Sequence, residues 1–195
     1  MFFKMSKLKK LLKDAYKVGC LTVGRSATTA GQEEGIYLSS GWWILWFLCD
    51  TMEKEIKAAI IELCGDLPAP GEVFLASKGG NQYEIEQKEV YDLPAQFFKN
   101  EGECKVTEVI LETRWYTASI IQEKSGAIHL VRNRIIEMFD GKGLREGEAW
   151  PTGPKIVGEM IGWTNYECYL AVLPIEKDEE YTDFYAALEK ITLPE

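Results

Sequence analysis

The sequence predicts an α+β protein in which antiparallel sheets, built from hairpins, carry helices packed on one face. Three observations predict this class. Segments rich in β-branched and aromatic residues occur in pairs that are joined by short turns, which is typical of hairpins. Amphipathic segments of helical period lie between these pairs. The chain lacks the regular alternation of strand and helix that builds a parallel sheet.

Composition limits the class of protein further. A chain of 195 residues can bury a sizeable core as one domain or as two small ones. Its five cysteines are scattered without a C-x-x-C pair, and there is a single histidine. We therefore expect reduced cysteines, no metal site and no cofactor. Because the chain shows neither a secretory signal nor an apolar run of about 20 residues, we expect a cytoplasmic protein without a membrane partner.

The first predicted helix, over residues 4–18, has a one-sided charge. At about 100° per residue, its apolar side chains from Met5 to Tyr16 fall in one arc, opposite a row of lysines. Residues 1–25 carry a charge of +6, so the other residues carry −15 to reach the total of −9. We expect the apolar stripe to pack on the core. The lysine row suits a solvated face, a phosphate backbone or an anionic membrane surface.

The other elements of the first half follow from turn and capping signals. Trp42, Trp43 and Trp46 lie in a hairpin over residues 36–49, where apolar neighbours favour core packing over base stacking. Asp50 and Glu53 form a capping-box-like pair at the start of a helix. The remaining expected features are a short strand at residues 20–23, a stop for that helix at Gly65, and a second hairpin with strands at 73–77 and 82–91.

An internal boundary is predicted within residues 92–104, where Pro94 and a polar turn interrupt the pattern. It divides the chain into halves at 1–98 and 99–195, or lies within one continuous domain. The second half is expected to contain a long strand at 106–122 with its return at 127–131, a short helix capped by Asn133 and ended by Gly141, a hairpin with strands at 155–163 and 168–175, and a terminal helix from Thr182 through 190.

Residues that could support catalysis are scarce. His129 alternates with apolar residues in a predicted strand, which indicates a histidine satisfied by its neighbours rather than a general base. Asp66, Glu86 and Lys88 have the composition of a metal-dependent hydrolase site. However, Glu-x-Lys occurs three times in this Glu- and Lys-rich chain, so the spacing is at chance level. We therefore expect a binding protein and not an enzyme.

Several short motifs carry a family resemblance. They are the strand run around Arg114-Trp115-Tyr116, the strand–helix step at 128–139, the closing Val172-Leu173-Pro174-Ile175, and residues 35–41 after the basic helix. Together they resemble small phage- or mobile-element-type proteins related to the DNA polymerase sliding clamps, with Leu173 where that group often has methionine. The resemblance implies two clamp-like subdomains and a basic helix that faces DNA.

Two functional hypotheses follow. By the resemblance, a non-enzymatic clamp-like protein would associate with duplex DNA or with a replication factor. The lysines in contact with the phosphate backbone would be Lys7, Lys10, Lys13 and Lys17, without reading base sequence. The acidic remainder of the chain instead favours a protein-interaction module of the immunity or inhibitor type, which would bind a basic protein partner. Self-association is compatible with either hypothesis.

Overall fold

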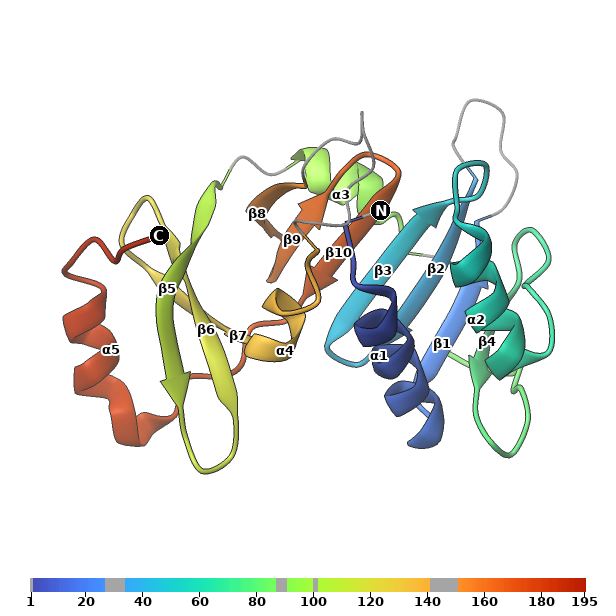
Figure 1. Cartoon of the computed structure of the whole chain (residues 1–195), viewed down its shortest axis with the longest axis horizontal. Helices are drawn as coiled ribbons and strands as arrows, with labels where there is room; N and C mark the ends of the chain where they lie inside the picture. The colour runs from blue at the N-terminus through green and yellow to red at the C-terminus, as the bar shows by residue number, and fades with distance from the viewer. Residues whose placement is uncertain (1, 27–33, 87–90, 100–101, 141–150) are drawn as a thin grey trace.

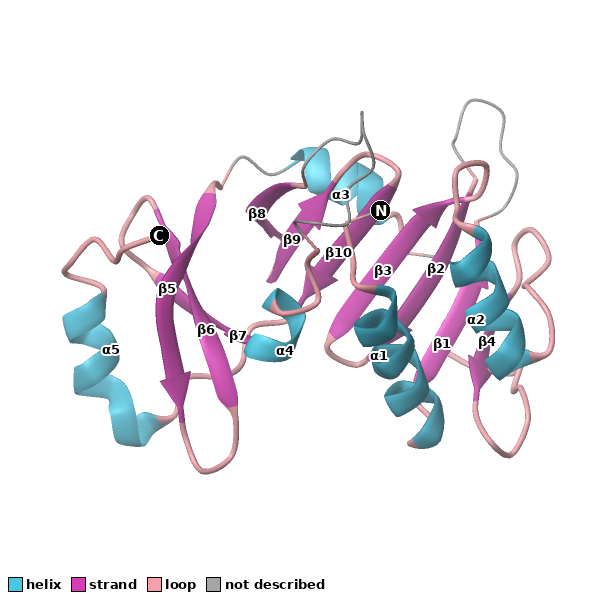
Figure 2. Cartoon of the chain, in the orientation of Figure 1, coloured by secondary structure: helices cyan, strands magenta, loops and turns pink. Residues whose placement is uncertain are grey.

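The computed structural model of the chain describes residues 2–26, 34–86, 91–99, 102–140 and 151–195 (Figure 1). The predicted α+β class is confirmed, since both sheets are antiparallel throughout. Helices lie outside the strand ladders and not between successive parallel strands (Figure 2).

The larger sheet has seven strands in the order β4-β1-β2-β3-β10-β9-β8. It joins both halves of the chain, because β10 pairs with β3 and places Leu170 opposite Leu45. The predicted division at residues 98 and 99 therefore runs through a single sheet. The strands are β1 (Leu21–Arg25), β2 (Gly35–Ser40), β3 (Trp43–Leu48), β4 (Val73–Ala76), β8 (Thr152–Val157), β9 (Met160–Thr164) and β10 (Cys168–Val172).

The smaller sheet has three strands in the order β5-β6-β7. They are β5 (Cys104–Glu112), β6 (Thr117–Glu123) and β7 (Ile128–Arg132). One face of this sheet joins the main core through Ile121 and Val131. The other face packs against Tyr185 of α5 (Thr182–Leu188) and against Leu193.

The main core lies between the larger sheet and two helices, α1 (Met5–Lys17) and α2 (Lys54–Cys64). The helices lie next to each other on one face of the sheet (Figure 1). The apolar stripe predicted for the first helix is confirmed, since its buried residues are Leu8, Leu11, Leu12 and Ala15. Burial of such a stripe stabilises a helix more than its intrinsic propensity does.

A short helix, α3 (Leu93–Lys99), covers the opposite face of the larger sheet. Its Leu93 and Phe97 pack on Tyr37, Trp46 and Tyr169. This helix occupies the segment that was expected to be an internal boundary. Pro94 did not exclude it, because proline is tolerated in the first turn of a helix, where its missing N–H would have no partner.

Turns divide two segments that were predicted as single strands. The strand expected at 106–122 is instead β5 and β6, because Thr113 Oγ1 accepts the backbone N–H groups of Trp115 and Tyr116 and closes a turn. The strand expected at 155–163 is instead the hairpin of β8 and β9, which turns at Gly158 with a φ of 62°. β-Branched composition alone does not reveal such tight turns.

Two predicted caps and one predicted strand also differ from the structure. Glu53 is the N-cap of α2, without a side-chain capping bond, so the helix begins later than Asp50. Asn133 lies inside α4 (Asn133–Ile136), whose N-cap is Arg132. The strand expected from residue 82 is reduced to one bridge between Gln82 and Leu75, and part of it, at 87–90, lies outside the described residues. Gly141 also lies outside them.

Candidate nucleic-acid interface

The four lysines predicted to contact DNA all lie on α1, but they differ in their surroundings. Lys7 forms an ion pair with Glu137 at 3.0 Å, and Lys13 forms one with Glu62 at 3.0 Å. Lys10 and Lys17 are exposed, and no ion pair is found for them within the described part of the chain. The lysine face of α1 (Lys7, Lys10, Lys13 and Lys17) is therefore partly neutralised.

The start of α1 is tied to α4. The backbone N–H of Lys4 donates to the carbonyl of Met138 at 2.8 Å, and Phe3 forms a β-bridge with Phe139. The ammonium group of Lys4 also donates to the Glu137 carbonyl at 3.0 Å. These contacts place the basic start of α1 beside α4, as Figure 1 shows.

Two arginines at the junction of β7 and α4 share one aromatic side chain. The guanidinium carbon of Arg132 lies 4.4 Å from the centre of the Trp42 ring, and that of Arg134 lies 4.5 Å from it. Trp42 lies in the turn between β2 and β3, about 90 residues before the arginines in the sequence. We call these three residues the Arg132–Arg134 cluster. Both distances are within the range of cation–π attraction.

The two arginines of the Arg132–Arg134 cluster form no ion pair within the described residues. No ion pair joins either guanidinium group to a carboxylate in residues 2–26, 34–86, 91–99, 102–140 and 151–195. Burial and the nearby charge of Arg134 lower the pKa of Arg132 below its usual value. Half-buried Arg132 and exposed Arg134 thus place two positive charges near each other, an arrangement that a bound anion would stabilise.

The tryptophans of the β2–β3 hairpin divide between core and surface. Trp43 and Trp46 are only 1% and 3% exposed, so the core interpretation is confirmed for both. Trp42 is half-buried, and its carbonyl accepts the N–H of Leu173 at 2.9 Å. That bond fixes the backbone of Trp42, and the ring packs against the main core and edge-on against Trp43, while the two arginines lie over it.

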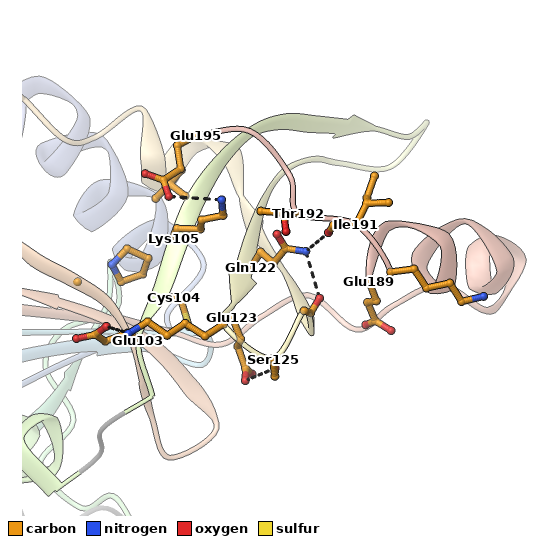
Figure 3. A pocket seen from close by; sticks show the side chains of 16 residues that line it. Glu103, Cys104, Lys105, Gln122, Glu123, Ser125, Glu189, Ile191, Thr192 and Glu195 are labelled. Carbon is orange, nitrogen blue, oxygen red and sulfur yellow. Dashed lines mark hydrogen bonds and ion pairs between the residues drawn. The ribbon is translucent and has the colours of Figure 1, made fainter.

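A separate cavity of about 870 Å³ lies at the end of the smaller sheet where β5 begins and β6 turns into β7 (Figure 3). Its walls are β5, the β6–β7 turn, the segment 189–195, and Gly153 and Pro154 of β8. Gln122 is 2% exposed, and its amide donates to the Ile191 carbonyl at 2.8 Å and accepts the N–H of Leu193 at 3.0 Å. These bonds fasten the segment 189–195 along the cavity.

Much of the charge around this cavity is internally paired. Lys124 pairs with Glu103, and Lys105 pairs with Glu195 at 3.4 Å. Burial raises the pKa of the Cys104 thiol to about 11, so this group stays protonated near neutral pH and is a poor nucleophile. The cavity therefore offers a weaker electrostatic signal for an anionic ligand than the Arg132–Arg134 cluster does.

The structure does not bring His129 or the hydrolase candidates into a described metal site. His129 Nε2 lies 2.6 Å from Glu123 Oε1, which confirms a strand histidine satisfied by a neighbour. Asp66 accepts the N–H of the adjacent Leu67, and Lys88 lies outside the described residues. Within the described part of the chain, no group of three His, Cys, Asp or Glu residues could hold a metal ion.

Sequence reasoning missed the Arg132–Arg134 cluster. The signal that could have pointed to it is the pair of arginines flanking Asn133 directly after a strand, together with a tryptophan beside Gly41 in a turn. Neither signal reveals that these segments meet. The contact depends on the smaller sheet and α4 packing beside the β2–β3 turn, which is a long-range arrangement.

Comparisons with protein-family models, with curated proteins and with solved structures found no match for this chain. None of the described helices has the length and apolar character that crossing a membrane requires.

Proposed function

We propose that this protein is a non-enzymatic nucleic-acid-binding protein that holds the phosphate backbone of DNA against α1, α4 and the β2–β3 turn. The observation that carries the proposal is the Arg132–Arg134 cluster, in which two guanidinium groups lie over one indole without a described carboxylate partner. Arginine is suited to phosphate because its planar fork donates two parallel hydrogen bonds.

The surrounding surface supports the same partner. Lys4 and Lys7 lie beside α4 through their contacts with Glu137, and exposed Lys10 follows Lys7 by three residues on α1. The chain has a net charge of −9, so attraction to a polyanion has to be local. A local basic surface on an acidic protein would orient the nucleic acid toward that surface alone. The family resemblance further suggests that the protein binds DNA in the manner of a sliding clamp.

Fluorescence anisotropy with a labelled duplex at about 50 and 200 mM salt tests the proposal, since each phosphate contact contributes about −0.9 to the salt slope. The double variant Arg132→Gln/Arg134→Gln should weaken binding and reduce the slope by at least about one unit, since the slope counts the phosphates that the two arginines neutralise. Arg114→Gln is the matched control. Its guanidinium also lies over a tryptophan, Trp115, at 4.7 Å, but in the β5–β6 turn.

Absence of binding at low salt, or an affinity that does not change with salt, would overturn the proposal. Equal losses in Arg114→Gln and in the double variant would show that general charge, and not the Arg132–Arg134 cluster, is responsible. If the protein binds a basic protein and no DNA, it is the acidic interaction module of the second hypothesis.

A further inference from the structure

We infer that the Arg132–Arg134 cluster binds a single terminal phosphate group of a nucleic-acid strand. This inference deepens the proposed function and rests on it, because it names the part of the nucleic acid that the same surface recognises. Three features carry it: the number of uncompensated charges, their fixed positions, and their access to solvent.

The charge count favours a terminal phosphate. The described surroundings leave two guanidinium groups without an ion pair. An internal phosphodiester carries one negative charge, whereas a terminal phosphate monoester carries about −1.5 to −2 near neutral pH. A monoester therefore carries enough charge to balance two arginines, and it offers three oxygens to N–H donors.

The backbone that carries the two arginines is held in place. Arg132 is the last residue of β7, and its register partner on β6 is Ala118. Between the arginines, the side chain of Asn133 accepts a hydrogen bond from Ser119 at 2.7 Å and donates one to Glu137 at 3.1 Å. Fixed donors lose less conformational entropy when a ligand binds.

Trp42 holds the side chains themselves. Both guanidinium carbons lie within 4.5 Å of its ring, and Trp42 is anchored through the N–H of Leu173. The face of the ring attracts the positive charge of a guanidinium group but does not act as a hydrogen-bond acceptor for the N–H groups that point along the guanidinium plane. These N–H groups can therefore donate to phosphate oxygens. Arg134 is exposed and Arg132 is half-buried, so a phosphate can enter from the side of Arg134.

The test compares two single strands of about 12 nucleotides, labelled at the 3′ end, one with a 5′-phosphate and one with a 5′-hydroxyl. Because charge-assisted hydrogen bonds are roughly twice as strong as neutral ones, the 5′-phosphate should tighten binding by about tenfold. Arg134→Gln should abolish this preference. Arg134→Lys should keep part of the affinity but lose the bidentate geometry. Arg114→Gln should keep the whole preference.

Equal affinity of the native protein for the two strands would overturn the inference, even if both strands bind in a salt-dependent way and so support the proposed function. A second result is calorimetry in which the native protein binds inorganic phosphate, Arg134→Gln does not, and neither strand binds. This result would support the anion site but overturn its assignment to nucleic acid. A phosphorylated peptide that binds as tightly as the 5′-phosphorylated strand would overturn that assignment as well. Thermal unfolding of each variant shows whether it is folded. Inorganic phosphate should compete with the 5′-phosphorylated strand for the native protein, which tests the site without a mutation.

Discussion

The ammonium group of Lys7 lies 3.0 Å from the carboxylate of Glu137, and this ion pair joins α1 to the C-cap of α4. Glu137 follows Arg134 by three residues, so both lie on neighbouring positions of the same helical turn. The carboxylate therefore places a negative charge between the lysine face of α1 and the Arg132–Arg134 cluster. It limits the positive potential of the proposed interface.

Glu137→Gln should consequently strengthen DNA binding. The amide keeps the size of the side chain but removes one negative charge, and exposed charge pairs are worth up to about 1 kcal/mol, so the gain should be about two- to fivefold. Anisotropy at low salt measures it. Glu62→Gln is the comparison. It releases Lys13, which is also on the lysine face of α1, but Glu62 belongs to α2 and not to the segment that carries the Arg132–Arg134 cluster, so its gain should be smaller. An equal gain in both variants would contradict a role for the surface around α4.

Gly35→Ala should destabilise the fold strongly. A Cβ at residue 35 would lie 1.9 Å from Cε2 of Trp46, and that ring is 3% exposed and packs edge-on against Tyr169. Overpacking of this kind costs about 1–3 kcal/mol or more in the free energy of unfolding. Urea unfolding measures the loss. Gly41→Ala is the matched control, since a Cβ there would meet nothing within 4 Å, and its effect should stay within about 0.5 kcal/mol.

Gln122→Leu should loosen the segment 189–195. It removes the donor to the Ile191 carbonyl and the acceptor of the Leu193 N–H, and it leaves the Leu193 N–H without that acceptor at a buried position. The expected cost is about 1–3 kcal/mol. Hydrogen exchange at the Leu193 amide should become faster. Glu195→Gln, which alters an exposed partner of Lys105, should leave that exchange rate nearly unchanged. Unchanged exchange in Gln122→Leu would show that the other contacts of the segment are sufficient to hold it, namely the burial of Leu193, the bond from Lys105 to the Leu193 carbonyl at 2.7 Å and the bond from the Glu108 N–H to the Pro194 carbonyl at 2.9 Å.

The pair of Glu123 and His129 should make stability depend on pH. The hydrogen bond to His129 holds the pKa of Glu123 below its usual range. A carboxylate with a lowered pKa in the folded state stabilises the fold above the unfolded pKa of about 4.3, and this contribution is lost as the pH falls through the folded value. Glu123→Gln should therefore cost up to about 1 kcal/mol at pH 7, because the pair is partly exposed, and less at lower pH.

Urea unfolding of Glu123→Gln and of the native chain at about pH 7, 5, 4 and 3 provides the comparison. The difference in unfolding free energy should shrink toward zero below about pH 4. A difference that stays constant over this range would mean that packing or the Ser125 hydrogen bond, and not the charge of Glu123, accounts for the loss.

Local patterns in the sequence were sufficient for most of the elements. The stripe of Leu8, Leu11 and Leu12 identified α1, because a period of 3.6 residues reflects which side of a helix is buried. The β2–β3 hairpin was identified by turn residues that interrupt a short apolar, tryptophan-rich run. The α+β class followed from the order of these elements. The turns at 113–116 and at Gly158 were missed, because β-branched residues continue up to both of them.

The sheet order and the Arg132–Arg134 cluster were beyond such patterns. The pairing of β10 with β3, and the contact of Trp42 with two arginines about 90 residues later, join segments that share no local signal. Periodicity reports only that a face is buried, whereas its partner depends on how all the apolar faces pack together in three dimensions. The lysines of α1 could thus be found from their spacing. The arrangement of Arg132 and Arg134 over Trp42 was decided by the packing of α4 against the β2–β3 turn.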